Sequence, residues 1–423
     1  MRARPAARRL LVHAAEGMDR VARIIDGVPN YDLLLKERVS ETERKAYQVL
    51  SLGTVRARAL NKMAERIALG GKVLALREPG IACDGRTSNN LREFAFLNRL
   101  CGRSILGTNY ATSERVPGPC RDHFGTVARA LILRAAAAFY SKRERITAGL
   151  AHQQAEYAHT LLFFARSLHA PDAVVPCALV QANDHSPQRV AASMVFKALG
   201  VPRIYLQHAE VSSYFPPLDM EHAVLRNARS LETYAAIGPV AGHTYVIPRG
   251  ITPDLPSLAR ERGSGVKVVV YPTSRVNASA LRDVIAKLVS NSHVAQVALK
   301  PHPGATVSAA DLLGSLADEV SYLDTIPEFD HVAVVGNSSV SVDLLQHGIP
   351  VYQCFTFDAV EADYYGLVAS GITLPAEDLT GRFWTPYSIN AAWRTAFARL
   401  APDPADAQAD VRALIGAINA LTK

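Results

Sequence analysis

The chain has 423 residues, which is more than one hydrophobic core normally serves, so the sequence predicts two domains. Hydrophobic residues make up 49% of it and charged residues 20%, as in ordinary soluble globular proteins, and no window approaches the roughly 18 consecutive apolar residues of a membrane-spanning helix. The net charge of +7 is dispersed, so we expect no nucleic-acid partner, while an anionic substrate and a negatively charged membrane surface both stay open.

The cysteines and the first residues bear on the compartment. The five cysteines form no CxxC pair, and their odd number and wide spacing argue against a disulfide framework or a structural zinc site. The opening stretch "MRARPAARRLLVHAA" carries four arginines, and no long apolar segment of a signal peptide follows it. We expect a cytoplasmic protein, and contact of this stretch with the inner face of the cytoplasmic membrane stays open.

The first half contains apolar runs that end on polar residues, the pattern of buried strands in a parallel sheet. Residues 186–200 have apolar side chains at helical spacing, with Pro187 near the first turn and Gly200 at the end, so they predict a helix. The predicted strands are "GKVLALRE" (71–78), "CALVQAND" (177–184), "PRIYLQHAE" (202–210) and the short strands or strand ends "ETYAAIG" (232–238) and "YVIPRG" (245–250).

Residues 248–267 are rich in Pro and Gly and have no periodicity, which predicts a linker. After it, strands and helices alternate at short intervals, as in a parallel sheet built from right-handed crossover units. The predicted strands are "VKVVVYPTS", "VAQVALK", "VSYLD", "HVAVVG" and "IPVYQC", and the predicted helices are "ASALRDVIAKLVSN", "AADLLGSLADE" and "SVSVDLLQHG".

We therefore predict an α/β protein with two Rossmann-like, parallel-sheet domains, 1–255 and 256–423, that face a cleft between them. The last helical stretch, "ADAQADVRALIGAINALTK", is expected to pack back across the junction. Ligands of open parallel sheets bind at the carboxyl ends of the strands, so the residues that follow each strand are the candidate site.

Two strand ends in the second half are polar. Lys300 and His302 lie in "KPHP", where each proline restricts itself and its predecessor and so holds the imidazole on a stiff backbone. Asn337, Ser338 and Ser339 form a small-residue loop before a helix, where backbone N–H groups and hydroxyls suit a phosphate. The alternatives are a turn whose His caps a helix, and ordinary helix capping by Asn337 or Ser338.

Two strand ends in the first half are also polar. Asp184 follows "CALVQAN", where a carboxylate facing the cleft would serve as base or nucleophile; the alternative is that it caps the next helix. Gln207, His208 and Glu210 follow "PRIYL", and here the alternative is a histidine that only supports other site residues. The weaker candidates are Ser274 and Arg275 for a phosphate, and Glu78, Asp84 and His185 for an acceptor.

Several motifs are missing and one resemblance is present. No H-E-x-x-H, GxGxxG, GxSxG or Walker pattern occurs, which removes the main support for metalloprotease, dinucleotide, hydrolase and P-loop functions. "LKPHPG" followed by "VVGNSSVSVDLLQHGIPVYQ" resembles the His-Pro and Ser-Ser motifs of GT-B glycosyltransferases of bacterial surface-polysaccharide assembly, a group that includes Kdo transferases and sialyltransferases. "QANDHSPQRVAASMVFKALGVPRIYLQHAEVS" resembles the strand-helix-strand of its capsule enzymes.

The resemblance implies a GT-B-like fold with an acceptor-side first domain and a nucleotide-sugar-binding second domain. It implies that His302, Ser338 and Ser339 bind the donor phosphate, that Lys300 adds charge, and that Asp184 is the catalytic carboxylate. His208 is a further catalytic candidate, and Asn337, Ser274, Arg275 and Gln207 are further donor-binding candidates.

The expected reaction moves an acidic sugar, Kdo-like or sialic acid, from a CMP-activated donor to a capsule, O-antigen or other lipid-linked glycan. No metal or other cofactor is expected, because His, Lys and a helix dipole offset the phosphate charge and no DxD pair is evident. The open alternatives are a CDP-glycerol-type polyol-phosphate transferase, a sugar-nucleotide 2-epimerase and a non-catalytic nucleotide-sugar-binding protein.

Overall fold

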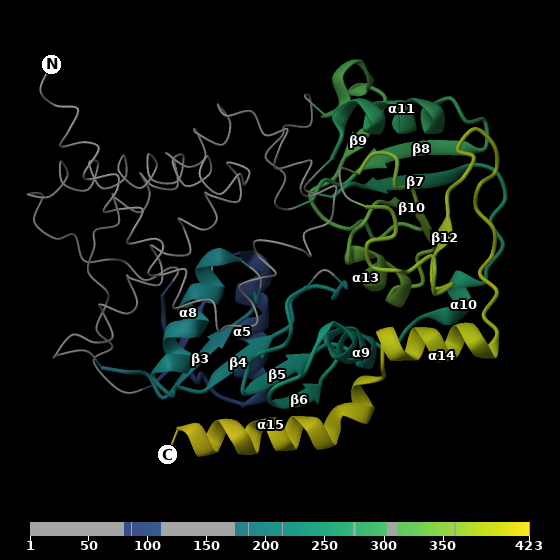
Figure 1. The fold of residues 1–423 in the computed structure, drawn as a ribbon. Helices are drawn as coiled ribbons and strands as arrows, with labels where there is room; N and C mark the ends of the chain where they lie inside the picture. The colour runs from purple at the N-terminus through teal and green to yellow at the C-terminus, as the bar shows by residue number, and fades with distance from the viewer. Residues whose placement is uncertain are drawn as a thin grey trace, which may run out of the picture.

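The computed structural model describes residues 80–85, 87–110, 174–184, 186–213, 215–273, 276–302, 312–358 and 361–422. Within them lie two six-stranded sheets in which every strand pair is parallel (Figure 1). This confirms the prediction of an α/β protein with two Rossmann-like sheets. The predicted strand 71–78 and four predicted site residues lie outside the described residues: Glu78, His185, Ser274 and Arg275.

The N-terminal sheet has the strand order β2-β1-β3-β4-β5-β6. Strand β1 lies between β2 and β3, so the strand order reverses at β1/β3, and the carboxyl ends of these strands form a topological switch point. Its elements are β1 (Ile81–Asp84), α5 (Ser88–Leu100), β2 (Leu106–Asn109), β3 (Ala178–Gln181), α8 (Pro187–Ala198), β4 (Arg203–Leu206), β5 (His222–Leu225), α9 (Ala228–Ile237) and β6 (His243–Val246).

The C-terminal sheet has the order β12-β11-β10-β7-β8-β9. The chain runs outward from β7 to β9 and then from β10 to β12, which is the doubly wound Rossmann order with a switch point between β7 and β10. Its elements are α10 (Leu255–Leu258), β7 (Val266–Tyr271), α11 (Ala278–Val289), β8 (Val294–Leu299), the 3₁₀ turn Gly314–Leu316, β9 (Ser321–Tyr322), β10 (Val332–Val335), α13 (Val340–Gln346), β11 (Val351–Gln353), β12 (Leu374–Pro375) and α14 (Ala391–Leu400).

Alternate residues of the central strands pack on opposite faces. In β7, Val268 and Val270 lie in the cluster that includes α11, whereas Val269 and Tyr271 lie in the cluster that includes α13 and α14. A side-chain period of two and burial on both faces explain why this strand is a continuous β-branched run in the sequence.

One predicted strand is wrong. Residues 232–237 belong to α9, with Gly238 as its C-cap, and Asn227 caps the start of this helix by accepting a hydrogen bond from the Ser230 N–H at 2.8 Å. Its buried residues include Tyr234 and Ile237, three apart, so the apolar period is helical. The strand that precedes α9 is the four-residue β5, which the sequence analysis did not predict.

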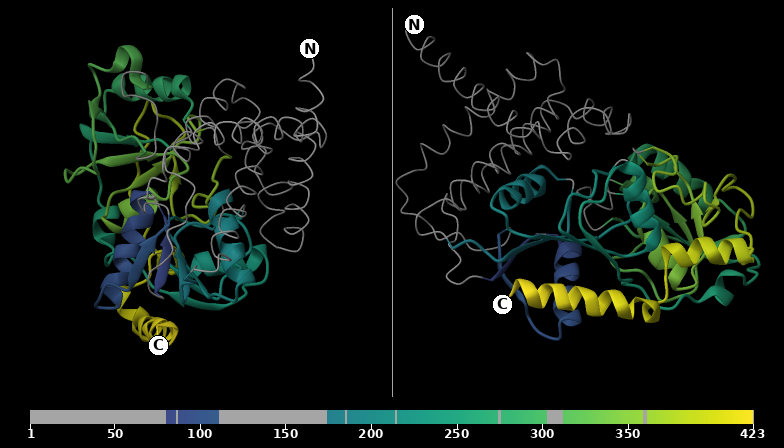
Figure 2. Two further views of the ribbon diagram at one scale, coloured as in Figure 1. Left: turned by 90° about the vertical axis from the view of Figure 1, so that its left-hand side faces the viewer. Right: turned by 60° about the horizontal axis from the view of Figure 1, so that its bottom comes forward.

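The end of the chain joins both sheets. The α14 residues Trp393 and Phe397 lie in the core of the C-terminal sheet, whereas Leu414 and Ile418 of α15 (Gln408–Leu421) lie in the core of the N-terminal sheet together with α5. Both views of Figure 2 place α15 beside α5. No helix in the described ranges is long and apolar enough to cross a bilayer.

Candidate active site

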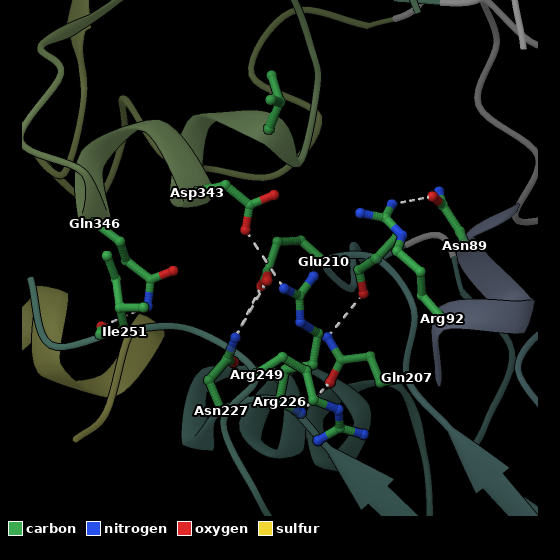
Figure 3. Close-up of polar contacts among 12 residues, drawn as sticks. Asn89, Arg92, Gln207, Glu210, Arg226, Asn227, Arg249, Ile251, Asp343 and Gln346 are labelled. Carbon is green, nitrogen blue, oxygen red and sulfur yellow. Dashed lines mark hydrogen bonds and ion pairs between the residues drawn. The ribbon is translucent and has the colours of Figure 1, made fainter. Parts of the chain in front are cut away.

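The carboxyl edges of the two sheets face each other. Arg226 directly follows β5, and its Nη2 lies 3.4 Å from Oδ1 of Asp343 on α13, the helix that follows β10 (Figure 3). At another place on these edges, burial lowers the pKa of Lys300 at the end of β8. The charge of Arg92 on α5 lowers this pKa further, so Arg92 lies near Lys300. The end of β5 therefore contacts α13, and α5 lies near the end of β8.

The loop from Gly336 to Ser339 lies at the switch point between β7 and β10, as predicted for a phosphate loop. The prediction that its backbone N–H groups are free is largely wrong. The Gly336 N–H bonds to Tyr271 at 3.2 Å, the Asn337 N–H to the Asp358 carboxylate, and the Ser338 N–H to Gly336 at 2.8 Å. Among the described residues, only the N–H of Ser339 remains without a partner in this loop.

The side chains of this loop also differ in whether a ligand can reach them. Asn337 is buried, its amide donating to the Glu361 carbonyl at 2.8 Å and accepting from the Tyr364 N–H at 2.7 Å, so it holds the loop and does not reach a ligand. Ser338 and Ser339 are half-buried, and their hydroxyls are the groups that a ligand can reach.

Asp358 organises this loop, and the sequence analysis missed it. Its carboxylate accepts hydrogen bonds from the Thr273 hydroxyl at 3.1 Å and from the Asn337 backbone N–H, so it joins the ends of β7 and β10. Burial raises the pKa of Asp358, and these hydrogen bonds oppose the shift. Nothing in the local pattern marks it, because its partners lie 21 and 85 residues away.

Lys300 and His302 extend from β8. The Lys300 N–H continues the β8–β7 ladder to Val270 at 2.9 Å, and its Nζ donates to the Pro301 carbonyl at 3.1 Å. Burial and then the charge of Lys300 lower the pKa of the half-buried His302 imidazole. Since β7 separates β8 from β10, His302 and the serines are two strand spacings apart, roughly 10 Å, which suits a ligand that spans more than one group.

Asp184 was predicted to face the opposite domain, and this is wrong. Its side chain is 3% exposed, and its Oδ2 accepts a hydrogen bond from the Tyr234 hydroxyl at 2.6 Å. The Tyr234 and Tyr205 hydroxyls lie 3.2 Å apart, and burial, followed by the charge of Asp184, raises the pKa of both phenols. Asp184 therefore belongs to a buried network between β3, β4 and α9.

Two further candidates of the N-terminal sheet are buried as well. Asp84 is 1% exposed and pairs with Arg189 of α8 at 2.7 Å. Glu210 is 4% exposed and accepts from the Asn227 amide at 3.0 Å, and burial raises its pKa. The prediction that Asp84 and Glu210 meet an acceptor conflicts with this burial.

Gln207 is completely buried, which corrects its predicted contact with the donor. Its Nε2 donates to the Ala209 carbonyl and to the Ser230 hydroxyl, both at 2.8 Å, and its Oε1 accepts from the Arg226 N–H at 2.8 Å. The neighbouring His208 is half-buried, with its Nδ1 in the buried part of the ring.

Two arginines at this edge were also missed, Arg226 after β5 and Arg249 after β6. The Arg249 side chain is 7% exposed; its Nε donates to Glu93 at 2.8 Å, and its guanidinium lies 4.0 Å from the centre of the Phe96 ring. Its Nη2 is buried without a partner. Recognising β5 as a strand would have pointed to Arg226, because it is the first residue after that strand.

No group of three or more His, Cys, Asp and Glu side chains that could hold a metal ion occurs in the part of the chain that the structure describes. The described surface also has hollows. One, of about 350 Å³, is lined by Tyr352, Pro375 and Arg382 among others, and the second, of about 440 Å³, by Arg229, Thr233 and neighbours.

Comparison with known proteins gives no family match and no match among curated proteins. Solved structures that the chain resembles include a UGT transferase from Siraitia grosvenorii in complex with UDP (11% identity, 81% of this chain, 94% of that chain, TM-score 0.39). They also include a UDP-forming α,α-trehalose-phosphate synthase from Burkholderia vietnamiensis (11%, 82%, 95%, 0.39) and the calicheamicin glycosyltransferase CalG4 (12%, 81%, 99%, 0.41). We base the fold on the order of the strands in the two sheets.

Proposed function

We propose that this chain is a nucleotide-sugar-dependent glycosyltransferase that binds its donor between the carboxyl edges of the two sheets. The observation that carries the proposal is the contact of Arg226 with Asp343, since it joins the strand end of one Rossmann-like sheet to the helix after the switch point of the other. Open parallel sheets bind ligands at such points. Two facing edges allow one protein to hold a donor and an acceptor in the orientation that transfer needs.

The carboxyl edge of the C-terminal sheet has side chains that suit the phosphate of the donor. Lys300 and His302 provide cationic groups, and Ser338 and Ser339 provide hydroxyls near the switch point. In the proposed step, an acceptor hydroxyl attacks the anomeric carbon, the bond from this carbon to the phosphate oxygen breaks, and the nucleotide leaves with the bonding electrons. Positive groups stabilise the leaving phosphate, and His302 in its protonated form donates a proton to it.

The base that takes the acceptor proton is proposed to be His208. It lies at the carboxyl end of β4 and is half-buried, whereas Asp184 is sealed in its tyrosine network. A base must come within hydrogen-bond reach of the acceptor hydroxyl, and this favours the accessible group. Asp184 then supports the sheet edge through Tyr234.

The finer identity rests on the sequence motifs: "LKPHPG" and the Ser338–Ser339 loop support a CMP-activated acidic sugar and a surface-glycan acceptor. We further propose that the protein works in the cytoplasm, at the inner face of the membrane where lipid-linked acceptors lie. A CDP-glycerol-type transferase, a 2-epimerase and a binding protein are the competing functions.

Thermal-shift titration with CMP, CDP, UDP and GDP tests the donor class, because a ligand that binds only the folded state at about 100 times its Kd stabilises it by about 2.7 kcal/mol. A selective shift with CMP supports the proposal, whereas selectivity for CDP favours the polyol-phosphate transferase. Nucleotide release from the sugar nucleotide that requires a glycan acceptor indicates transfer; release without one favours the epimerase. Binding without any turnover contradicts the enzymatic function.

A further inference from the structure

We propose that Arg226 is a substrate-binding residue held on Asp343 in the ligand-free protein, and that an anionic oxygen group of the nucleotide sugar replaces Asp343 as its partner. This inference rests on the proposed function and deepens it, because it names the residue through which the N-terminal sheet reaches the donor.

Hydrogen bonds hold the backbone at Arg226 in place. Its backbone N–H donates to the buried Gln207 amide at 2.8 Å, which ties the end of β5 to the end of β4. The next residue, Asn227, caps α9 through Ser230 and donates to the buried Glu210 carboxylate at 3.0 Å (Figure 3). The side chain therefore starts from a preorganised position, and only its own rotamers have to change when its partner changes.

The contact with Asp343 is weak enough to be exchanged. It consists of a single N–O approach of 3.4 Å, and the Asp343 side chain is 42% exposed, against 17% for Arg226. A single long contact to a partly exposed carboxylate stabilises little, so a competing anion can replace it. A guanidinium forms stronger, two-pronged contacts with a phosphate or a carboxylate.

Asp343 lies close to the predicted phosphate loop. It is four residues beyond Ser339, so the two residues occupy one face of the first turn of α13, about 6 Å apart between Cβ atoms. An anion that contacts the Ser339 hydroxyl would therefore lie near the Asp343 carboxylate, which Arg226 contacts. Arg226 comes from the N-terminal sheet and Ser339 from the C-terminal sheet, so a shared anion would bridge the two sheets.

Burial would lower the pKa of Arg226, but the charges of Asp343, Glu210 and Glu93 together raise it, and two of these carboxylates have hydrogen-bond partners of their own. Glu210 is engaged by Asn227, and Glu93 is engaged by Arg249, whose buried Nη2 has no partner of its own. Among these three carboxylates of the described residues, Asp343 is the one whose side chain makes only a single long contact, the 3.4 Å approach to Arg226.

Isothermal titration with CMP, CDP, UDP and a CMP-linked acidic sugar tests this exchange in four proteins. Arg226→Gln should weaken binding by about 10-fold to 100-fold, the range for a hydrogen bond to a charged group. Asp343→Asn should strengthen binding several-fold, because it removes the competing carboxylate and touches no ligand. Arg229→Gln is the matched control: this neighbouring arginine donates to the Tyr365 and Gly366 carbonyls at 2.8 Å, and its loss should leave the affinity unchanged.

The ligand dependence identifies the anion. Weaker binding of the plain nucleotides by Arg226→Gln indicates a phosphate, whereas weakening only with the CMP-linked acidic sugar indicates the sugar carboxylate. Wild-type affinity of Arg226→Gln for every ligand, or weaker binding by Asp343→Asn, overturns the inference and leaves the proposed function standing. If the wild-type protein binds none of these ligands, the proposed function fails together with it.

Discussion

The carboxylate of Asp358 occupies the space directly beside the Cα of Gly336, where the Cβ of any other residue would overlap it. From this position it receives the Asn337 N–H and the Thr273 hydroxyl, so one buried carboxylate determines the shape of the loop at the β7/β10 switch point. The loop therefore depends on a residue that it does not contain, and this dependence can be tested apart from overall stability.

The first prediction concerns Asp358→Asn. Burial raises the pKa of Asp358, so its ionised form is less favourable in the folded protein than in the unfolded chain; removing the charge relieves this cost and should change the melting temperature at neutral pH little. It should nevertheless lower nucleotide affinity by about 10-fold, because an amide cannot accept both hydrogen bonds with charged oxygens. Calorimetric melting and isothermal titration of the same preparation check the two halves of this prediction.

Gly336→Ala provides an independent change to the same loop, since its Cβ must displace the Asp358 carboxylate. Its nucleotide affinity should fall as in Asp358→Asn. The contrast is Gly263→Ala, where a Cβ would meet nothing within 4 Å. Unchanged affinity in both loop variants would show that the Gly336–Ser339 loop does not form part of the nucleotide site.

The central strands β7 and β10 of the C-terminal sheet were predictable because each is a run of apolar residues buried on both faces, whereas the two-residue β12 was not predicted. Val268 to Tyr271 alternate between two packed clusters, and no competing helical period exists in such a β-branched segment. By contrast, β5 has only four residues, and the helical spacing of Tyr234 and Ile237 was misinterpreted as a strand.

The candidate site was predictable in its location, and the accessibility of its residues was not. Parallel strands bring their polar ends to one edge whatever the side-chain details, so Lys300, His302 and the serines were found by position alone. Whether a carboxylate is exposed depends on partners far away in the sequence. Asp184 meets Tyr234 fifty residues later, and Asp84 meets Arg189, and no local pattern carries that information.

The second prediction concerns protonation of His302. Burial and the neighbouring Lys300 lower the pKa of this imidazole, so it is neutral at neutral pH in the free protein. A bound phosphate favours the charged form and raises the pKa. Binding should therefore take up as much as about one proton, and affinity should increase as the pH falls toward the ordinary histidine range and decrease as it rises.

Titrations in buffers with different ionisation enthalpies measure this uptake directly. His302→Gln should bind more weakly and take up no proton. The matched control is His222→Gln, since burial and His243 also lower the pKa of His222, which lies at the amino end of β5 away from the facing edges. Proton uptake that persists in His302→Gln would assign it to another group.

The third prediction compares the ion pairs of a buried arginine with that of an exposed lysine; both residues approach Asp219. Arg203 is 2% exposed in its side chain; it pairs with Glu221 at 2.8 Å and approaches Asp219 at 3.6 Å, and its Nη1 donates to Ser193 at 3.0 Å. Lys197 pairs with Asp219 at 2.8 Å, but 45% of its side chain is exposed. Arg203→Met should lower the free energy of unfolding by about 2–4 kcal/mol, because it leaves buried polar groups without partners. Lys197→Met should lower it by less than about 1 kcal/mol.

Urea denaturation at a series of pH values gives the third prediction a second readout. Burial opposes ionisation of Glu221, but the hydrogen bonds and charge of Arg203 outweigh it and lower the pKa of Glu221. A lowered carboxyl pKa contributes stability that is present above the ordinary glutamate range and is lost as the pH falls through the folded-state value. The wild-type protein and Lys197→Met should both show this acid-side decrease. Arg203→Met should lack the part due to Glu221, because its carboxyl then titrates near its ordinary pKa in both the folded and the unfolded state. An equal acid-side decrease in all three proteins would mean that Arg203 does not stabilise the ionised form of Glu221.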